Sequence, residues 1–116
     1  MRRTDQRFPK AKRIRQRNEF VRIQSRGRRR GQGHFVVITT APATAVSRLG
    51  ITASRKVGNA VTRNRIKRLI REFFRRHSQE IIPPQDVVVI ARASAAEIGY
   101  EDVARELSAA LRLRLT

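Results

Sequence analysis

The stretch NAVTRNRIKRLIREFFRR, residues 59–76, decides the fold of this 116-residue chain. Its large apolar side chains recur every three or four residues, which places them on one stripe of an α-helix. That stripe consists of Ile66, Leu69, Ile70, Phe73 and Phe74. The other positions include seven arginines and lysines but only one acid, Glu72, which is spaced to pair with Arg68 and Arg76. The pattern predicts a long helix that begins near residue 59 and ends near residues 79–81, ahead of two prolines.

Three strands are predicted around this helix. HFVVITT at residues 34–40 is rich in β-branched side chains. Apolar and small or polar residues alternate over residues 48–54, which is typical of a strand with one buried face. The continuous apolar run DVVVIA at residues 86–91 favours a strand that is buried on both faces.

The N-terminal quarter is polar and basic. Residues 1–17 are expected to form an extended basic arm that becomes ordered on binding a partner. Asn18 can cap a short helix that runs to about Ser25, with Gly27 ending it. Residues 28–33 are expected to be a basic turn or the frayed start of a strand.

A last helix is predicted over about residues 100–113, preceded by a capping box at Ser94 and Glu97. Its apolar register consists of Tyr100, Val103, Ala104, Leu107 and Leu111. Together these elements predict one domain over residues 1–116 of the α/β (α+β) class. We expect a two-layer sandwich, in which a small mixed sheet carries helices on one face.

The formal net charge of +18 lies in two blocks, +11 over residues 1–31 and +8 over residues 55–76, whereas residues 77–116 sum to −2. Of the 27 basic side chains, 23 are arginine, whose planar fork suits bidentate contact with phosphate. The charge predicts a polyanionic partner, and nucleic acid is the foremost candidate. An ordinary solvated basic face is the simpler alternative.

The long helix supplies a geometry for such binding. Arg68, Arg71 and Arg75 follow one another at about one turn, on the side away from the apolar stripe, which suits contacts to successive phosphates. Gly58 permits a tight turn before the helix, and the free N–H groups of residues 58–61 can hold an anion.

A catalytic centre is not expected in the protein. The chain has no cysteine, its two histidines are far apart, and four acids near the last helix are better explained by the helix dipole. Neither a converging carboxylate set for a two-metal nuclease nor a metal site is evident. No apolar run approaches the roughly 20 residues of a membrane span, and the N-terminus lacks a secretory signal. We therefore expect a cytoplasmic binding protein without a membrane or small-molecule partner.

The segment ASRKVGNAVTRNRIKRLIREFFR, residues 53–75, resembles the signature of the bacterial ribonuclease P protein component. FPKAKRIRQRNEF upstream and DVVVIARASAAEIGYEDVARELSAAL downstream are similar to the same family, so the resemblance covers about residues 8–113. It implies an accessory subunit of a ribonucleoprotein endoribonuclease that removes the 5′ leader from precursor tRNA. The resemblance also implies that the RNA subunit performs the hydrolysis and holds most of the Mg²⁺, while the protein contributes no catalytic residue and no metal ligand.

The resemblance also assigns residues to two surfaces. The surface for the catalytic RNA comprises Arg55, Lys56, Asn59, Arg63, Asn64, Arg65, Lys67, Arg68 and Arg71. A cleft between the first helix and the open sheet face is expected to hold the 5′ leader as an extended single strand, with Arg13, Phe20, Val36 and Ile38 as its contacts. Gln24 and Ile38 stand where some relatives have aromatic residues. From the sequence alone, Phe20 could equally pack in the core or stack on a base.

Three other classes of protein remain possible at this stage: a ribosomal type of RNA-binding protein, a stand-alone nuclease and a membrane-surface binder. Stimulation of precursor-tRNA cleavage by a catalytic RNA at low Mg²⁺ would distinguish the expected subunit from the first. A stand-alone nuclease would need a set of catalytic side chains, which the sequence lacks. A membrane-surface binder would need to expose the apolar stripe that the core requires.

Overall fold

The computed structural model describes residues 10–113. Its helices are α1 (Arg17–Arg26), α2 (Ala60–His77) and α3 (Tyr100–Leu111), and its strands are β1 (Arg28–Gln32), β2 (Phe35–Thr40), β3 (Arg48–Ala53) and β4 (Asp86–Ala91). Three short 3₁₀ turns, η2 (Lys10–Lys12), η3 (Ser78–Glu80) and η4 (Ala93–Glu97), complete the described chain. The long helix, the last helix and the three predicted strands are thus confirmed within two or three residues at their ends.

The strands form one mixed sheet in the order β1-β2-β4-β3. β1 pairs antiparallel with β2, and β2 pairs antiparallel with β4. β3 runs parallel to β4, since α2 carries the chain from one strand to the other. The central position of β4 explains its apolar sequence, because both of its faces are covered.

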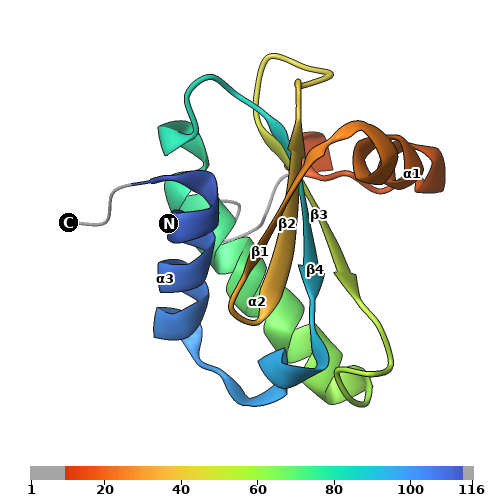
Figure 1. Ribbon diagram of the computed structural model, residues 1–116, viewed down its shortest axis with the longest axis vertical. Coiled ribbons are helices and arrows are strands. Elements are labelled where there is room, and N and C mark those ends of the chain that lie inside the picture. The colour runs from red at the N-terminus through yellow and green to blue at the C-terminus, as the bar shows by residue number, and fades with distance from the viewer. Residues whose placement is uncertain (1–9, 114–116) are drawn as a thin grey trace, which may run out of the picture.

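The helices α2 and α3 pack on one face of the sheet (Figure 1). The predicted stripe of α2 contributes four fully buried side chains, Ile66, Ile70, Phe73 and Phe74. Leu69 is half-buried at the margin of the same core. Phe73 and Phe74 therefore belong to the core, as the periodicity predicts.

The helix α1 lies on the opposite face of the sheet (Figure 1). It packs through Ile23 over a second, smaller core that contains Ile14, Ile38 and Val88. The open face expected from the sequence is thus only partly open, because α1 covers the strands β2 and β4.

Two local predictions were wrong, and a third had two alternatives, of which the structure shows one. Gln16, not Asn18, precedes the first helical residue, and no side chain caps this end. Of the two alternatives for residues 28–33, the strand is the one found over residues 28–32, because cross-strand pairing with β2 overrides the weak strand propensity of three arginines. The capping box at Ser94 is absent: Ala93–Glu97 is a 3₁₀ turn, and Gly99 precedes α3.

The basic arm is only partly described. Residues 1–9 lie outside the described chain. From residue 10 the segment is docked, since Ile14 is 3% exposed and its N–H donates to the Leu49 carbonyl at 2.8 Å. The extended arm predicted for residues 1–17 therefore does not apply to residues 10–17.

Candidate nucleic-acid interface

The N-terminus of α2 is fixed by local contacts. Gly58 has a φ of 151°, a backbone conformation that residues other than glycine rarely adopt. Asn59 follows as the N-cap, and its side-chain Oδ1 accepts a hydrogen bond of 3.0 Å from the Thr62 N–H. Val57, which is 4% exposed, anchors the turn in the core. Asn59, an exposed residue, thus uses its side-chain oxygen to begin the helix.

An exposed basic surface runs along α2 and the turn that precedes it. Arg55, Lys56 and Arg68 are exposed, and no carboxylate of residues 10–113 pairs with them. Arg63 and Lys67 are half-buried beside them and likewise have no acidic partner in the described chain. The structure therefore brings most of the predicted RNA-binding residues together on one continuous surface.

Glu72 partly neutralises the C-terminal end of this surface. Its carboxylate accepts hydrogen bonds from Arg75 Nη2 at 2.7 Å and from Arg76 Nε at 2.6 Å. These bonds, Arg75 first, hold the pKa of Glu72 below its usual value despite partial burial. The predicted pairing with Arg76 is confirmed, but Arg68 is not a partner and stays available.

Arg65 has a different environment from its neighbours. Its guanidinium donates to the Ile98 carbonyl at 2.7 Å and to the Ala96 carbonyl at 3.4 Å. The side chain is half-buried and ties α2 to the connection between η4 and α3. The structure thus places Arg65 apart from the exposed surface, although it belongs to the predicted set.

Arg71 lies on α2 near the edge strand β3. Together with Lys67 it lines a hollow of about 190 Å³ at the edge of β3, to which the N-terminal segment contributes Arg13 and Arg15. Burial, and secondarily the positive charge of Arg13, lowers the pKa of the Arg71 guanidinium. Like charges crowded in this way favour an anion between them.

A groove lies beyond this hollow, between α1 and β3. It encloses about 420 Å³ and is lined by Arg15, Arg17, Phe20, Val21, Gln24 and Thr52. Phe20 is half-buried: part of its ring packs closely over Gly50, where a Cβ would approach the ring to 2.7 Å. The remainder of the ring faces both the groove and the hollow. Phe20 therefore serves as core residue and as groove wall at once.

The predicted contacts on the sheet divide into two kinds. Val36 is half-buried at the margin of the α1 core, where it faces Ile90 across the β2–β4 pair. Ile38 is 0% exposed, because α1 and the close approach of Gly27 cover it. The expectation that Ile38 lines the open cleft needs correction, since its side chain is part of the core beneath α1.

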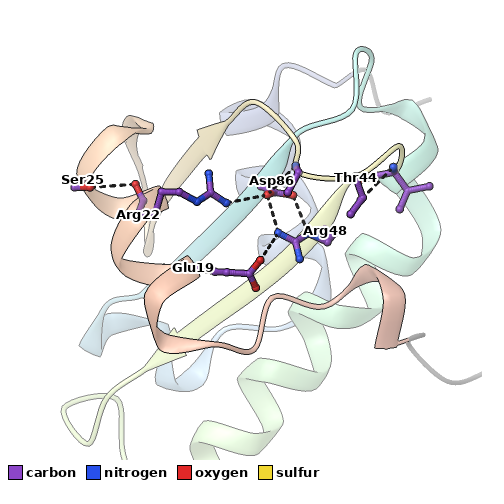
Figure 2. A network of polar contacts seen from close by, with 8 residues as sticks. Glu19, Arg22, Ser25, Thr44, Arg48 and Asp86 are labelled. Atoms are coloured by element: carbon purple, nitrogen blue, oxygen red, sulfur yellow. Dashed lines mark hydrogen bonds and ion pairs between the residues drawn. The ribbon is translucent and has the colours of Figure 1, made fainter.

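A buried ion network holds α1 in place over the sheet (Figure 2). Arg48 donates to Asp86 at 2.9 and 3.1 Å and to Glu19 of α1 at 3.0 Å. Arg22 of α1 also approaches Asp86, at 3.6 Å. The pKa of Arg48 is raised chiefly by its bonds to Asp86. Sequence reasoning missed this network, because its members lie far apart in the chain.

The described residues contain neither a metal-ligand cluster nor a membrane-spanning helix. Within residues 10–113, no three His, Asp or Glu side chains gather as they would around a metal ion. Over the same residues, no helix is both long and apolar enough to cross a bilayer.

Comparison with known proteins gives a consistent result. The model of the Ribonuclease P family matches residues 8–114. The ribonuclease P protein component of Syntrophus aciditrophicus is 43% identical over 102 residues, covering 88% of this chain and 86% of that protein. That of Desulfovibrio desulfuricans is 44% identical over 109 residues, covering 90% and 84%.

Solved structures agree in fold as well as in sequence. The Staphylococcus aureus RNase P protein superposes with a TM-score of 0.81 at 39% identity, covering 89% of this chain and 94% of that one. The Thermotoga maritima RNase P protein superposes with a TM-score of 0.78 at 34% identity, covering 88% and 97%. With the family model matched over nearly the whole sequence, the chain belongs to the ribonuclease P protein family.

Proposed function

We propose that this protein is the protein subunit of ribonuclease P, which assists a catalytic RNA in removing the 5′ leader from precursor tRNA. The observation that carries the proposal is the continuity of two surfaces. The unpaired basic surface of α2 passes through Lys67 and Arg71 into the hollow at β3, and the hollow shares Arg15 and Phe20 with the groove beside α1. The catalytic RNA and the extended 5′ leader could thus be bound next to each other.

The α2 surface is assigned to the catalytic RNA. Its side chains are mostly arginines and lysines without acidic partners in the described chain, which favours contacts to phosphates over contacts to bases. Such contacts position an RNA without reading its sequence. They also release counterions, so the affinity falls steeply with salt.

The groove beside α1 is assigned to the leader. It combines Arg15 and Arg17 with the exposed part of Phe20, a pairing of cations and an aromatic ring that suits single-stranded nucleic acid. Stacking of one base on such a ring stabilises binding by roughly 1–3 kcal/mol where it occurs. Gln24, in the same groove, offers hydrogen bonds in place of a second ring.

The chemistry belongs, in this proposal, to the RNA subunit, with Mg²⁺ held mainly by RNA. The protein contributes electrostatics: it lowers the repulsion between two polyanions and thereby reduces the Mg²⁺ concentration that assembly requires. We also propose a cytoplasmic location, since precursor tRNA is made there in bacteria.

Reconstitution tests the proposal. The catalytic RNA is assayed for cleavage of precursor tRNA at low Mg²⁺, alone and with the protein. The expected result is strong stimulation by the wild type, less by Arg68→Ala, and an undiminished effect of Arg105→Ala, an exposed arginine of α3 that pairs with Asp102. Equal rates with and without wild-type protein would reject the role, and equal losses in both variants would reject the assigned surface.

A further inference from the structure

A second hollow, distinct from the one at the edge of β3, lies on the opposite face of the sheet from the groove. It encloses about 180 Å³ between β1, β2 and the C-terminal end of α3, and three arginines line it: Arg28, Arg30 and Arg112. In the strand register Arg28 faces Thr39 and Arg30 faces Val37, both of which line the same hollow. The hollow is therefore on the α3 face of the sheet, whereas the groove lies on the α1 face.

These three arginines differ from others that touch the folded body. Arg48 bonds to carboxylates, Arg65 to two carbonyls, and Arg92 to the Gly33 carbonyl at 2.9 Å. By contrast, the guanidinium groups at the hollow have no hydrogen bond or ion pair with any group of residues 10–113. The hollow thus gathers three cationic side chains with no carboxylate among the residues that line it.

The position of Arg112 is set by the end of α3. Its φ is 60°, in the left-handed region that glycine or asparagine adopts more readily. The N–H groups of Arg112 and Leu113 donate to the Ala109 and Ser108 carbonyls, at 3.2 and 2.8 Å, which fixes the backbone there. The chain therefore carries an arginine where helix termination by itself favours a residue without a long side chain.

Electrostatics favour an anion in this hollow. The C-terminal end of α3 contributes a partial charge of about −0.5. Three guanidinium groups, each with a full positive charge and five N–H donors, outweigh it. The volume exceeds by far the roughly 10–15 Å³ that a single water needs by this kind of measure, so a phosphate group has room.

We propose that Arg28, Arg30 and Arg112 bind a phosphate of an RNA backbone, as a third contact separate from the α2 surface and the groove. The inference rests on the proposed function, since it takes the partner to be an RNA of the ribonuclease P particle. The phosphate comes either from the catalytic RNA or from the body of the precursor tRNA. Both sources present the same phosphodiester, and the experiment distinguishes them.

The test uses the absence of cysteine from the chain. A single cysteine is introduced at Ala109, an exposed position beside the hollow that leaves all three arginines in place. An iron chelate attached to it generates hydroxyl radicals that cut nearby RNA backbone in the reconstituted particle, with and without precursor tRNA. A second protein carries the chelate at Val61 of α2, which is 77% exposed.

We expect the chelate at residue 61 to cut the catalytic RNA, and the chelate at residue 109 to cut a different backbone segment. The RNA that is cut from residue 109 identifies the source of the phosphate. Cutting from residue 61 but none from residue 109 would overturn this inference and leave the proposed function standing. No cutting from either position would overturn both.

A matched pair of variants gives a second measurement. Arg28→Gln/Arg30→Gln removes two charges from the hollow, and Arg26→Gln/Arg29→Gln removes two neighbouring charges that do not line it. Loss of one phosphate contact lowers the slope of log affinity against log salt by about 0.9, so the defect of the first variant should shrink about threefold between 50 and 200 mM salt. The control should keep the wild-type slope, and equal slopes in both variants would contradict the site.

Discussion

Arg48 and Asp86 face each other across the parallel pair of β3 and β4, and Asp86 is 0% exposed. The guanidinium donates two hydrogen bonds to this carboxylate and a third to Glu19, so one arginine joins the sheet to α1. Because α1 forms one wall of the groove, this pair fixes the geometry of the candidate leader site.

Removal of one partner from this pair should be costly. Asp86→Ala leaves the guanidinium of Arg48 buried with only Glu19 as its partner, and we expect a loss of about 3–5 kcal/mol in the free energy of unfolding. Urea denaturation measures it. Asp102→Ala, which removes an exposed ion pair with Arg105, is the control and should cost less than about 1 kcal/mol. Equal costs in the two variants would show that the network does not hold α1.

The pH dependence of stability should show the contribution of Glu72. Hydrogen bonds from Arg75 and then Arg76 lower its pKa below the ordinary value of a glutamate in the folded state. A carboxylate with a depressed folded pKa stabilises the fold above its unfolded pKa, and that contribution is lost as the pH falls through the folded value. The difference in unfolding free energy between wild type and Glu72→Gln should therefore be constant near neutral pH and shrink below about pH 4.5. A difference that grows on acidification would contradict the assignment.

A buried carboxylate on α3 binds the turn of the β1–β2 hairpin. Glu106, which is 6% exposed, accepts hydrogen bonds from the His34 backbone N–H at 2.8 Å and pairs with its ring Nδ1 at 2.7 Å. Gly33 has a φ of 57°, and a Cβ there would collide with the Glu106 carboxyl group. We expect Glu106→Ala to cost about 1–3 kcal/mol of stability.

Gly33→Ala should destabilise the protein as well, since it adds steric overlap to an unfavourable backbone conformation. Thermal unfolding measures both variants. An unchanged melting temperature for Gly33→Ala would contradict the close approach of α3 to the hairpin.

Gly50 sets the position of Phe20. A Cβ at this site would lie 2.7 Å from the Phe20 ring and 3.1 Å from Ile14. Gly50→Ala should therefore displace the ring from the groove and weaken binding of a single-stranded leader oligonucleotide more than binding of the catalytic RNA. Gly99→Ala is the matched control, since nothing lies within 4 Å of its added Cβ. Fluorescence anisotropy with the two RNAs provides the comparison.

How far the sequence predicted the structure depends on the kind of signal. The apolar stripe of α2 extends over more than two helical turns, so the helix and its four buried residues could be predicted from the sequence. The arginines of β1 carry no such signal, because only pairing with β2 makes that segment a strand. The salt bridge of Arg48 and Asp86 joins residues 38 positions apart and depends on the parallel register.

The candidate site was predictable to a similar extent. The exposed cations of α2 follow from helical spacing, and family resemblance supplied the groove. Neither indicated that Arg65 bonds to carbonyls of the η4 region or that α1 buries Ile38 completely. Both facts depend on how separate elements pack, which periodicity along one element does not encode.

The most direct test of the central claim compares two substrates with and without the protein. The affinity of the catalytic RNA for precursor tRNA and for mature tRNA, which lacks the leader, is measured at one fixed Mg²⁺ concentration. If the protein holds the catalytic RNA by α2 and the leader by the α1 groove, adding it should raise the preference for precursor over mature tRNA, and Gly50→Ala should reduce that gain. A preference that is the same with and without the protein would contradict the account.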